Sequence, residues 1–197
     1  VPLKMHQQHL DEIVLTKTGL PINGEPHLEP WLNFLHRMKN ATKTVRIGLV
    51  GKYVELPDAY KSINESLFQA ATYNDRKLDL QYIHSEKLNS GNVDAMLSSL
   101  DGVLIAPGFG QRGIEGKFIA LKYAREHDIP TFGVCLGMQC MVIEYARDVL
   151  GYTDANSTEM DVTTKHNVID LMEEQKSITN MGGTMRLGAY DCILSED

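Results

Sequence analysis

The sequence predicts an α/β protein built on a doubly wound, mostly parallel sheet with an antiparallel extension. From residue 44 to residue 150, apolar strands and amphipathic helices alternate four times, which is typical of such a sheet. The strands are largely apolar, as expected where helices cover both faces. Beyond Leu150 the alternation stops, and two strand-like runs, 166–171 and 185–194, follow without a helix between them.

The elements follow one another in a regular order. The predicted strands span residues 45–50, 78–84, 101–107 and 129–135. A helix is expected from about Asp58, a good N-cap residue, and others over 93–100 and 115–126. Apolar spacing predicts that the helix after the fourth strand buries one stripe, formed by Met138, Met141, Val142, Tyr145 and Val149.

The first 43 residues differ from the rest. They hold a short apolar stretch at 10–15, a run rich in Gly and Pro, and a brief helix at 29–38. This is too little apolar surface for an independent core, so residues 1–43 are interpreted as a linker and an arm that packs on something else. Residues 44–197 form the predicted domain. The chain starts with Val instead of Met, which suggests an excerpt of a longer protein.

Composition excludes several classes of protein. The formal net charge is −7, which disfavours a general nucleic-acid binder. No apolar run approaches the roughly 18 residues of a membrane helix, and the N-terminus lacks the apolar core of a signal peptide. Three Cys without a C-x-x-C pair indicate neither a disulfide framework nor a metal site. A reducing cytoplasm is the expected location.

The segment Gly133-Val134-Cys135-Leu136-Gly137 is G-x-C-x-G between a strand and a helix. It is the thiol version of the nucleophile elbow, in which a strained turn needs small neighbours and pushes the central side chain into the cleft. The helix N-terminus favours the thiolate. The alternative is a buried structural Cys, and that is the interpretation for Cys140 and Cys192.

Gly108, Gly110 and Gly113 spell G-x-G-x-x-G after the third strand. This is formally a dinucleotide fingerprint, but the acidic residue expected about 20 positions later is replaced by Cys135. Two other interpretations stay open. The glycines serve a tight turn, or they bring backbone N–H groups close to a ligand, as an oxyanion hole requires.

Five segments of the sequence together indicate a protein family. They are GVCLGMQ and PGFGQRG, described above, and GKYVELPDAYKS, DANSTE and GGTMRLG. Together they resemble the class I, triad-type glutamine amidotransferase domains of the CTP synthase family, over essentially the whole chain. The resemblance implies a flavodoxin-like fold and an enzyme that hydrolyses L-glutamine. The ammonia would serve the ATP-dependent amination of UTP to CTP in pyrimidine biosynthesis.

The resemblance also assigns residues. Cys135 would be the nucleophile, and Gly108 and Leu136 would supply oxyanion-hole N–H groups. Gly137, Met138 and Gln139 would line the glutamine pocket. Glu159 would hold the substrate ammonium, although Asn156-x-x-Glu159 also has the spacing of a helix capping box. Arg112 and Arg186 lie in regions that resemble those tied to activation by GTP.

No cofactor is expected in this chain, while ATP and Mg²⁺ would bind a synthetase domain that precedes it. A homo-oligomer is expected at full length. The family's base and its carboxylate partner form an H-x-E motif, expected here beyond Asp197. Within the chain, His166 is the first residue to consider as a base.

Two alternatives of other classes remain. One is another elbow-Cys hydrolase of the same architecture, such as a cysteine peptidase. The other is a non-catalytic protein that binds a ligand or an oxidant at a reactive thiol.

Overall fold

A computed structural model describes residues 1–171 of the chain. The predicted run 185–194, Arg186 and Cys192 lie outside the described residues. Contacts divide the chain into two compact units, Val1–Arg46 with Tyr60–Leu80, and Ile47–Ala59 with the chain from Gln81 onward. The predicted boundary between residues 43 and 44 stays a prediction.

A four-stranded sheet has the order β2-β1-β3-β4. Its strands are β1 (Lys43–Gly51), β2 (Arg76–His84), β3 (Gly102–Ile105) and β4 (Thr131–Gly133). β1 pairs with β3 in parallel, Ile47 opposite Gly102, and β3 pairs with β4 in parallel, Val103 opposite Thr131. The chain order reverses between β1 and β3. In such sheets, ligands bind beyond the carboxyl ends of the strands at this point.

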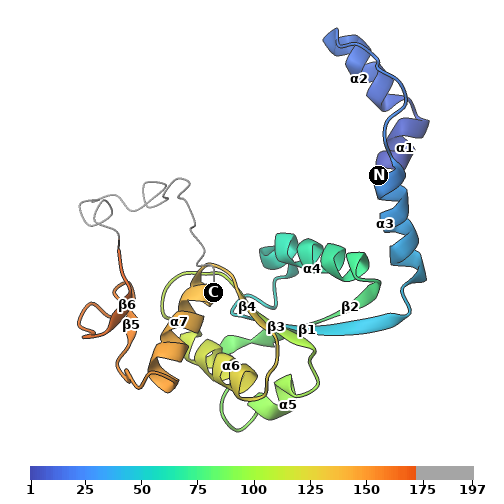
Figure 1. Cartoon of the computed structure of the whole chain (residues 1–197). Coiled ribbons are helices and arrows are strands. Elements are labelled where there is room, and N and C mark those ends of the chain that lie inside the picture. The colour runs from blue at the N-terminus through green and yellow to red at the C-terminus, as the bar shows by residue number, and fades with distance from the viewer. Residues whose placement is uncertain (172–197) are drawn as a thin grey trace, which may run out of the picture. The chain divides into compact units, whose positions relative to one another are not determined.

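Three helices lie together on one face of the sheet: α5 (Val93–Leu97), α6 (Ile114–Glu126) and α7 (Leu136–Asp148) (Figure 1). Between them and the strands lies a core of buried apolar side chains, which include Val50, Ile83, Leu97, Ile105, Phe118, Leu121, Cys140 and Ile143. Arg125 of α6 forms a salt bridge with Glu144 of α7, in which Arg125 Nη2 lies 2.7 Å from Glu144 Oε1. The alternating elements and the doubly wound architecture predicted from the sequence are confirmed.

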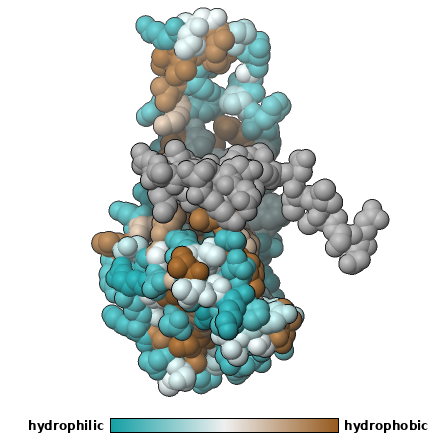
Figure 2. All heavy atoms as spheres, turned by 90° about the vertical axis from the view of Figure 1, so that its left-hand side faces the viewer, coloured by the Kyte–Doolittle hydropathy of each residue, from teal (hydrophilic) through white to brown (hydrophobic). Residues whose placement is uncertain are grey.

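Of the predicted buried stripe of α7, Met141 packs partly buried against the core, but the other four residues are exposed, so the prediction is wrong for them. Met138, Val142, Tyr145 and Val149 are between 39% and 50% exposed. The helix instead turns Leu136, Gly137, Cys140, Ile143, Glu144 and Ala146 inward. The reason is steric, because small residues let α7 approach the backbone of β3 more closely than Met and Tyr would allow. Figure 2, viewed from the side that carries α7, β5 and β6, shows hydrophobic groups scattered over a largely hydrophilic surface.

A second, two-stranded sheet follows α7. It is formed by β5 (Asn156–Ser157) and β6 (Asn167–Ile169). The strand predicted in 166–171 is therefore present, but it pairs with β5 in parallel. The intervening segment 158–166 carries the chain back to the end at which β5 began. Among the described residues the antiparallel extension is thus not found, and its second predicted strand lies outside them.

The N-terminal unit contains α1 (Pro2–Gln7), α2 (Leu10–Thr18), α3 (Glu29–Asn40) and α4 (Lys61–Tyr73). None of the first three helices has a buried residue. Aromatic rings join α3 to α4, with Phe34 stacked on Trp31 at 5.3 Å and edge-on to Phe68 at 6.2 Å. The helix expected from Asp58 is a 3₁₀ turn, Pro57–Tyr60, followed by α4, and a further 3₁₀ turn spans Ser85–Lys87.

In the described part of the chain no helix is long and apolar enough to cross a bilayer. A search of the same residues for three or more clustered His, Cys, Asp or Glu side chains that could hold a metal ion finds none.

Candidate active site

Cys135 sits in the predicted elbow between β4 and α7. Its φ of 53° and ψ of −113° lie in a region that non-glycine residues rarely occupy. Val134 N–H still donates to Ile105 O of β3, at 3.1 Å, so the chain turns sharply only at Cys135. The thiol is exposed. Strain at one exposed residue, held by regular structure on both sides, is typical of a functional site.

The two glycines that flank Cys135 are required by close backbone contacts. A Cβ atom added at Gly133 would lie 2.5 Å from Met138 N, and one added at Gly137 would lie 2.2 Å from Ile105 O. Neither space admits a methyl group. The sequence-based explanation of the G-x-C-x-G pattern is therefore correct.

The predicted oxyanion donors lie side by side. Leu136 is the first residue of α7, so its N–H has no partner inside the helix. Gly108 lies against it, since a Cβ added at Gly108 would be 3.7 Å from Leu136 Cδ2. The glycine loop thus reaches the Leu136 side chain at the start of α7, directly after Cys135. Of the predicted pocket residues on α7, Gly137 is buried, Gln139 is half-buried and Met138 is exposed.

Two lysines hold the carbonyl groups on either side of Gly108. Lys52 follows β1 and donates from Nζ to Phe109 O at 2.5 Å. Lys117 of α6 donates from Nζ to Ala106 O at 2.7 Å, and its side chain is only 2% exposed. Burial is the main cause that lowers the pKa of Lys117. The sequence predicts neither contact: Lys52 lies in a loop that could point anywhere, and a Lys on an amphipathic helix such as Lys117 normally indicates a solvated face.

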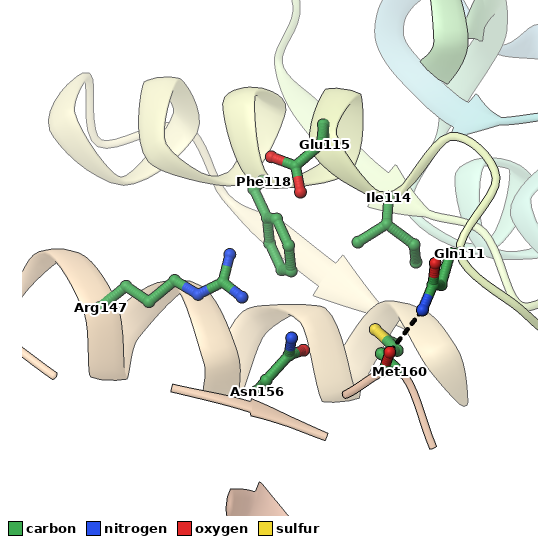
Figure 3. A pocket seen from close by; sticks show the side chains of 7 residues that line it. All are labelled: Gln111, Ile114, Glu115, Phe118, Arg147, Asn156 and Met160. Atoms are coloured by element: carbon green, nitrogen blue, oxygen red, sulfur yellow. Dashed lines mark hydrogen bonds between the residues drawn. The ribbon is translucent and has the colours of Figure 1, made fainter. Parts of the chain in front are cut away.

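The segment that carries Glu159 lies next to the glycine loop. Gln111 Nε2 donates to Met160 O and joins the two (Figure 3). Glu159 is exposed, and its N–H donates to Ser157 Oγ at 3.2 Å. No helix begins here, since residues 156–157 form β5 and a turn follows. The capping-box interpretation of Glu159 is therefore wrong.

The Arg112 side chain makes two contacts in the described structure. Its guanidinium lies 3.1 Å from Glu86 Oε2 and 5.3 Å from the centre of the Tyr53 ring. Arg186, the other residue predicted to respond to GTP, lies outside the described residues.

A cavity of about 300 Å³ lies between α6, α7 and β5 (Figure 3). Phe118 and Ile114 face Arg147 and Asn156 across it. Arg147 already has two partners within the protein. Its Nε donates to Ala155 O at 2.6 Å, and its guanidinium lies over the Phe118 ring, 4.6 Å from the ring centre. None of the predicted site residues lines this cavity. It is therefore separate from the elbow.

Three histidines in the second unit have partners other than the thiol. His166 Nδ1 lies 2.6 Å from Asp154 Oδ1, and its ring stacks on Tyr152. His127 stacks on Tyr123, and His84 faces Glu55 at 3.4 Å. Within residues 1–171, no hydrogen bond joins a histidine to Cys135. Cys140 is buried in the core, as predicted, and burial raises the pKa of its thiol to about 11.

The sheet order and the strained, exposed Cys at the elbow are typical of the class I glutamine amidotransferase fold. In agreement, the family described as "Glutamine amidotransferase class-I" matches residues 55–197. The chain belongs to this family.

Comparison with individual proteins points to a narrower group within this family. The chain is 68% identical to the CTP synthase of Bacteroides fragilis over all 197 of its residues, which cover 37% of that protein. It is 62% identical to the CTP synthase of Porphyromonas gingivalis over 98% of the chain and 36% of that protein. The chain thus spans little more than a third of the length of these relatives.

A solved structure agrees with them. The chain resembles the Trypanosoma brucei CTPS glutaminase domain with bound acivicin, with a TM-score of 0.61 and 41% sequence identity. The match covers 66% of this chain and 51% of that one.

Proposed function

We propose that this chain is the glutaminase part of a CTP synthase and hydrolyses L-glutamine with Cys135 as the nucleophile. The observation that carries the proposal is the exposed, strained thiol at the N-terminus of α7, beside the glycine loop. A helix N-terminus stabilises a thiolate, and a thiolate is the nucleophilic form of Cys.

The reaction divides into two steps. The Cys135 thiolate adds to the amide carbon of glutamine, and the carbonyl oxygen becomes an oxyanion. The N–H groups of Gly108 and Leu136 would donate to that oxygen, whose charge exists only in the intermediate and the adjoining transition states. Collapse breaks the C–N bond, releases ammonia and leaves a thioester. Water then adds to the thioester carbon, and a second collapse releases glutamate and the thiol.

Substrate binding is assigned to the groups around the elbow. Gly137, Met138 and Gln139 form the start of α7, where glutamine would lie against the helix. Glu159 would bind the substrate's α-ammonium. Its carboxylate has the required charge, and the Gln111–Met160 contact keeps its segment beside the glycine loop.

Proton transfer needs a further group. The departing ammonia must gain a proton, and the attacking water must lose one. Because no described histidine is bonded to Cys135, we assign both transfers to the H-x-E pair that the resemblance predicts beyond Asp197.

The ammonia would pass to a synthetase part, where ATP and Mg²⁺ would activate UTP for conversion to CTP. We assign no cofactor to this chain. GTP would activate glutamine hydrolysis through Arg112 and Arg186, and the enzyme would act as a homo-oligomer in the cytoplasm. Displacement of Arg112 from Glu86 would free its guanidinium for an anionic effector.

A serine at the elbow tests this division of labour in the protein at its natural length. Cys135→Ser should abolish ammonia release from glutamine, because the hydroxyl lacks the acidity of the thiol. CTP formation from added ammonia should stay at the unmodified level, since ammonia bypasses the elbow. Loss of both activities in a folded variant would refute the assignment. A hydrolase of another substrate, or a non-catalytic thiol protein, would release no ammonia even before substitution.

A further inference from the structure

Lys117 is buried in a place that is unfavourable for a cation. It lies in the first turn of α6, where the helix dipole repels positive charge. Its side chain is 2% exposed, and lysines are almost never buried so deeply unless they are paired. No carboxylate pairs with it in the described part of the chain. Stability alone therefore does not explain a Lys at this position.

Within residues 1–171, the side chain of Lys117 makes one hydrogen bond, and it leads to the glycine loop. Its Nζ donates to Ala106 O, at 2.7 Å. Ala106 follows β3 directly, and its own N–H donates to Val50 O of β1 at 2.9 Å. The next two residues are Pro107 and Gly108. Lys117 thus fixes the last peptide group before the predicted oxyanion donor.

The other end of this short segment is held from the surface. Lys52 Nζ donates to Phe109 O at 2.5 Å. Gly108 lies between the two anchored carbonyl groups, with Leu136 against it. The orientation of the Gly108 peptide therefore depends on two lysine contacts, of which only that of Lys117 is shielded from water.

Three titratable groups influence the charge of Lys117: the thiol of Cys140 on α7, the thiol of Cys135 directly before α7, and the ammonium of Lys52 after β1. Cys140 remains a thiol, because burial raises its pKa to about 11. Cys135 is exposed, and none of the three groups is a carboxylate that could pair with Lys117.

We propose that Lys117 is a positioning residue for glutamine hydrolysis: it fixes the Ala106 carbonyl so that Gly108 meets the oxyanion. This inference rests on the proposed function. In this role Lys117 acts through the Ala106 carbonyl and needs no contact with the substrate.

Lys117→Met tests the proposal in the protein at its natural length, since Met keeps the apolar stem and removes both donor and charge. We expect kcat for ammonia release to fall by about tenfold to a hundredfold, with KM for glutamine within about twofold. The thermal midpoint should not fall, because replacing a buried charge by an apolar group of similar size is often neutral or stabilising. CTP formation from added ammonia should be unchanged.

Lys122→Met is the matched control. Lys122 lies on the same helix but is 50% exposed and pairs with Asp148 at 3.2 Å. The Lys122→Met substitution should leave kcat for ammonia release unchanged. If Lys117→Met does not fold, Lys117→Leu provides the same test, since it also removes the donor to Ala106 O and the charge.

Folded Lys117 variants with kcat within about twofold of the unmodified protein would overturn the inference. So would parallel losses of thermal stability and of both activities, which a purely structural role predicts. An unmodified protein that releases no ammonia from glutamine would instead contradict the proposed function.

Discussion

Replacing Gly137 by alanine tests whether the close approach of α7 to β3 positions the nucleophile. The added Cβ would lie 2.2 Å from Ile105 O and 2.9 Å from Ile105 C. An ordinary carbon–oxygen contact is about 3.3 Å, so the start of α7 must move by about 1 Å. This movement would carry Cys135 and the Leu136 N–H, which directly precede Gly137, away from Gly108.

The expected effects follow from that displacement. A misplacement of about 1 Å can lower the rate about a hundredfold, so kcat for ammonia release should fall by about that factor. Overpacking typically costs about 1–3 kcal/mol of unfolding free energy, against which alanine regains about 1 kcal/mol of helix propensity. A net loss of up to about 2 kcal/mol is therefore expected in chemical denaturation.

The assay compares kcat, KM and denaturation curves of Gly137→Ala with those of Gly91→Ala. At Gly91 an added Cβ would meet only the flexible Asn89 side chain, at 3.2 Å. The control should behave like the unmodified protein. A folded Gly137→Ala protein with unchanged kcat would show that the close packing does not position the thiol.

Two further predictions concern other groups of the site. Glu159→Ala should raise KM for glutamine with little change in kcat or thermal stability, because the exposed carboxylate caps no helix; steady-state kinetics with an unchanged KM would exclude it from substrate binding. Burial lowers the pKa of Lys117, so between that pKa and the ordinary value of 10.5 the unfolded chain binds more protons than the folded one. The unfolding free energy of the unmodified protein should therefore rise with pH in this window relative to that of Lys117→Met, and a pH-independent difference between the two would contradict the assigned burial.

The elbow could be predicted from the sequence because its requirements are local. Gly133 and Gly137 flank the strained residue within five positions, and strand and helix patterns border them. The strand order places the glycine loop beside the elbow by a general rule of parallel sheets. Gly108 accordingly lies near the Leu136 side chain, while the role of both residues as oxyanion donors stays a prediction.

The orientation of α7 could not be predicted from its sequence. Both faces of the helix carry apolar residues, and periodicity alone favours the face with Met138, Val142 and Tyr145. The close contact between Gly137 and Ile105 decides otherwise, and it joins residues 32 positions apart. Only the packed structure contains that information.

Lys117 and Glu159 illustrate a second limit. A lysine on a helix reads as solvent-exposed until the neighbouring carbonyl of Ala106 is placed against it. The spacing of Asn156 and Glu159 suits a helix cap, yet pairing of β5 with β6 gives the segment another structure. In both cases tertiary contacts override a sound local preference.

The central claim is that Cys135 attacks the amide carbon of glutamine. Incubation of the protein with a chloroketone analogue of glutamine, followed by mass spectrometry of its peptides, tests this directly. We expect one adduct, on Cys135, that excess glutamine prevents, while the buried Cys140 stays unmodified. An adduct on Cys135 that forms equally fast with and without glutamine, or one on another residue alone, would contradict the account.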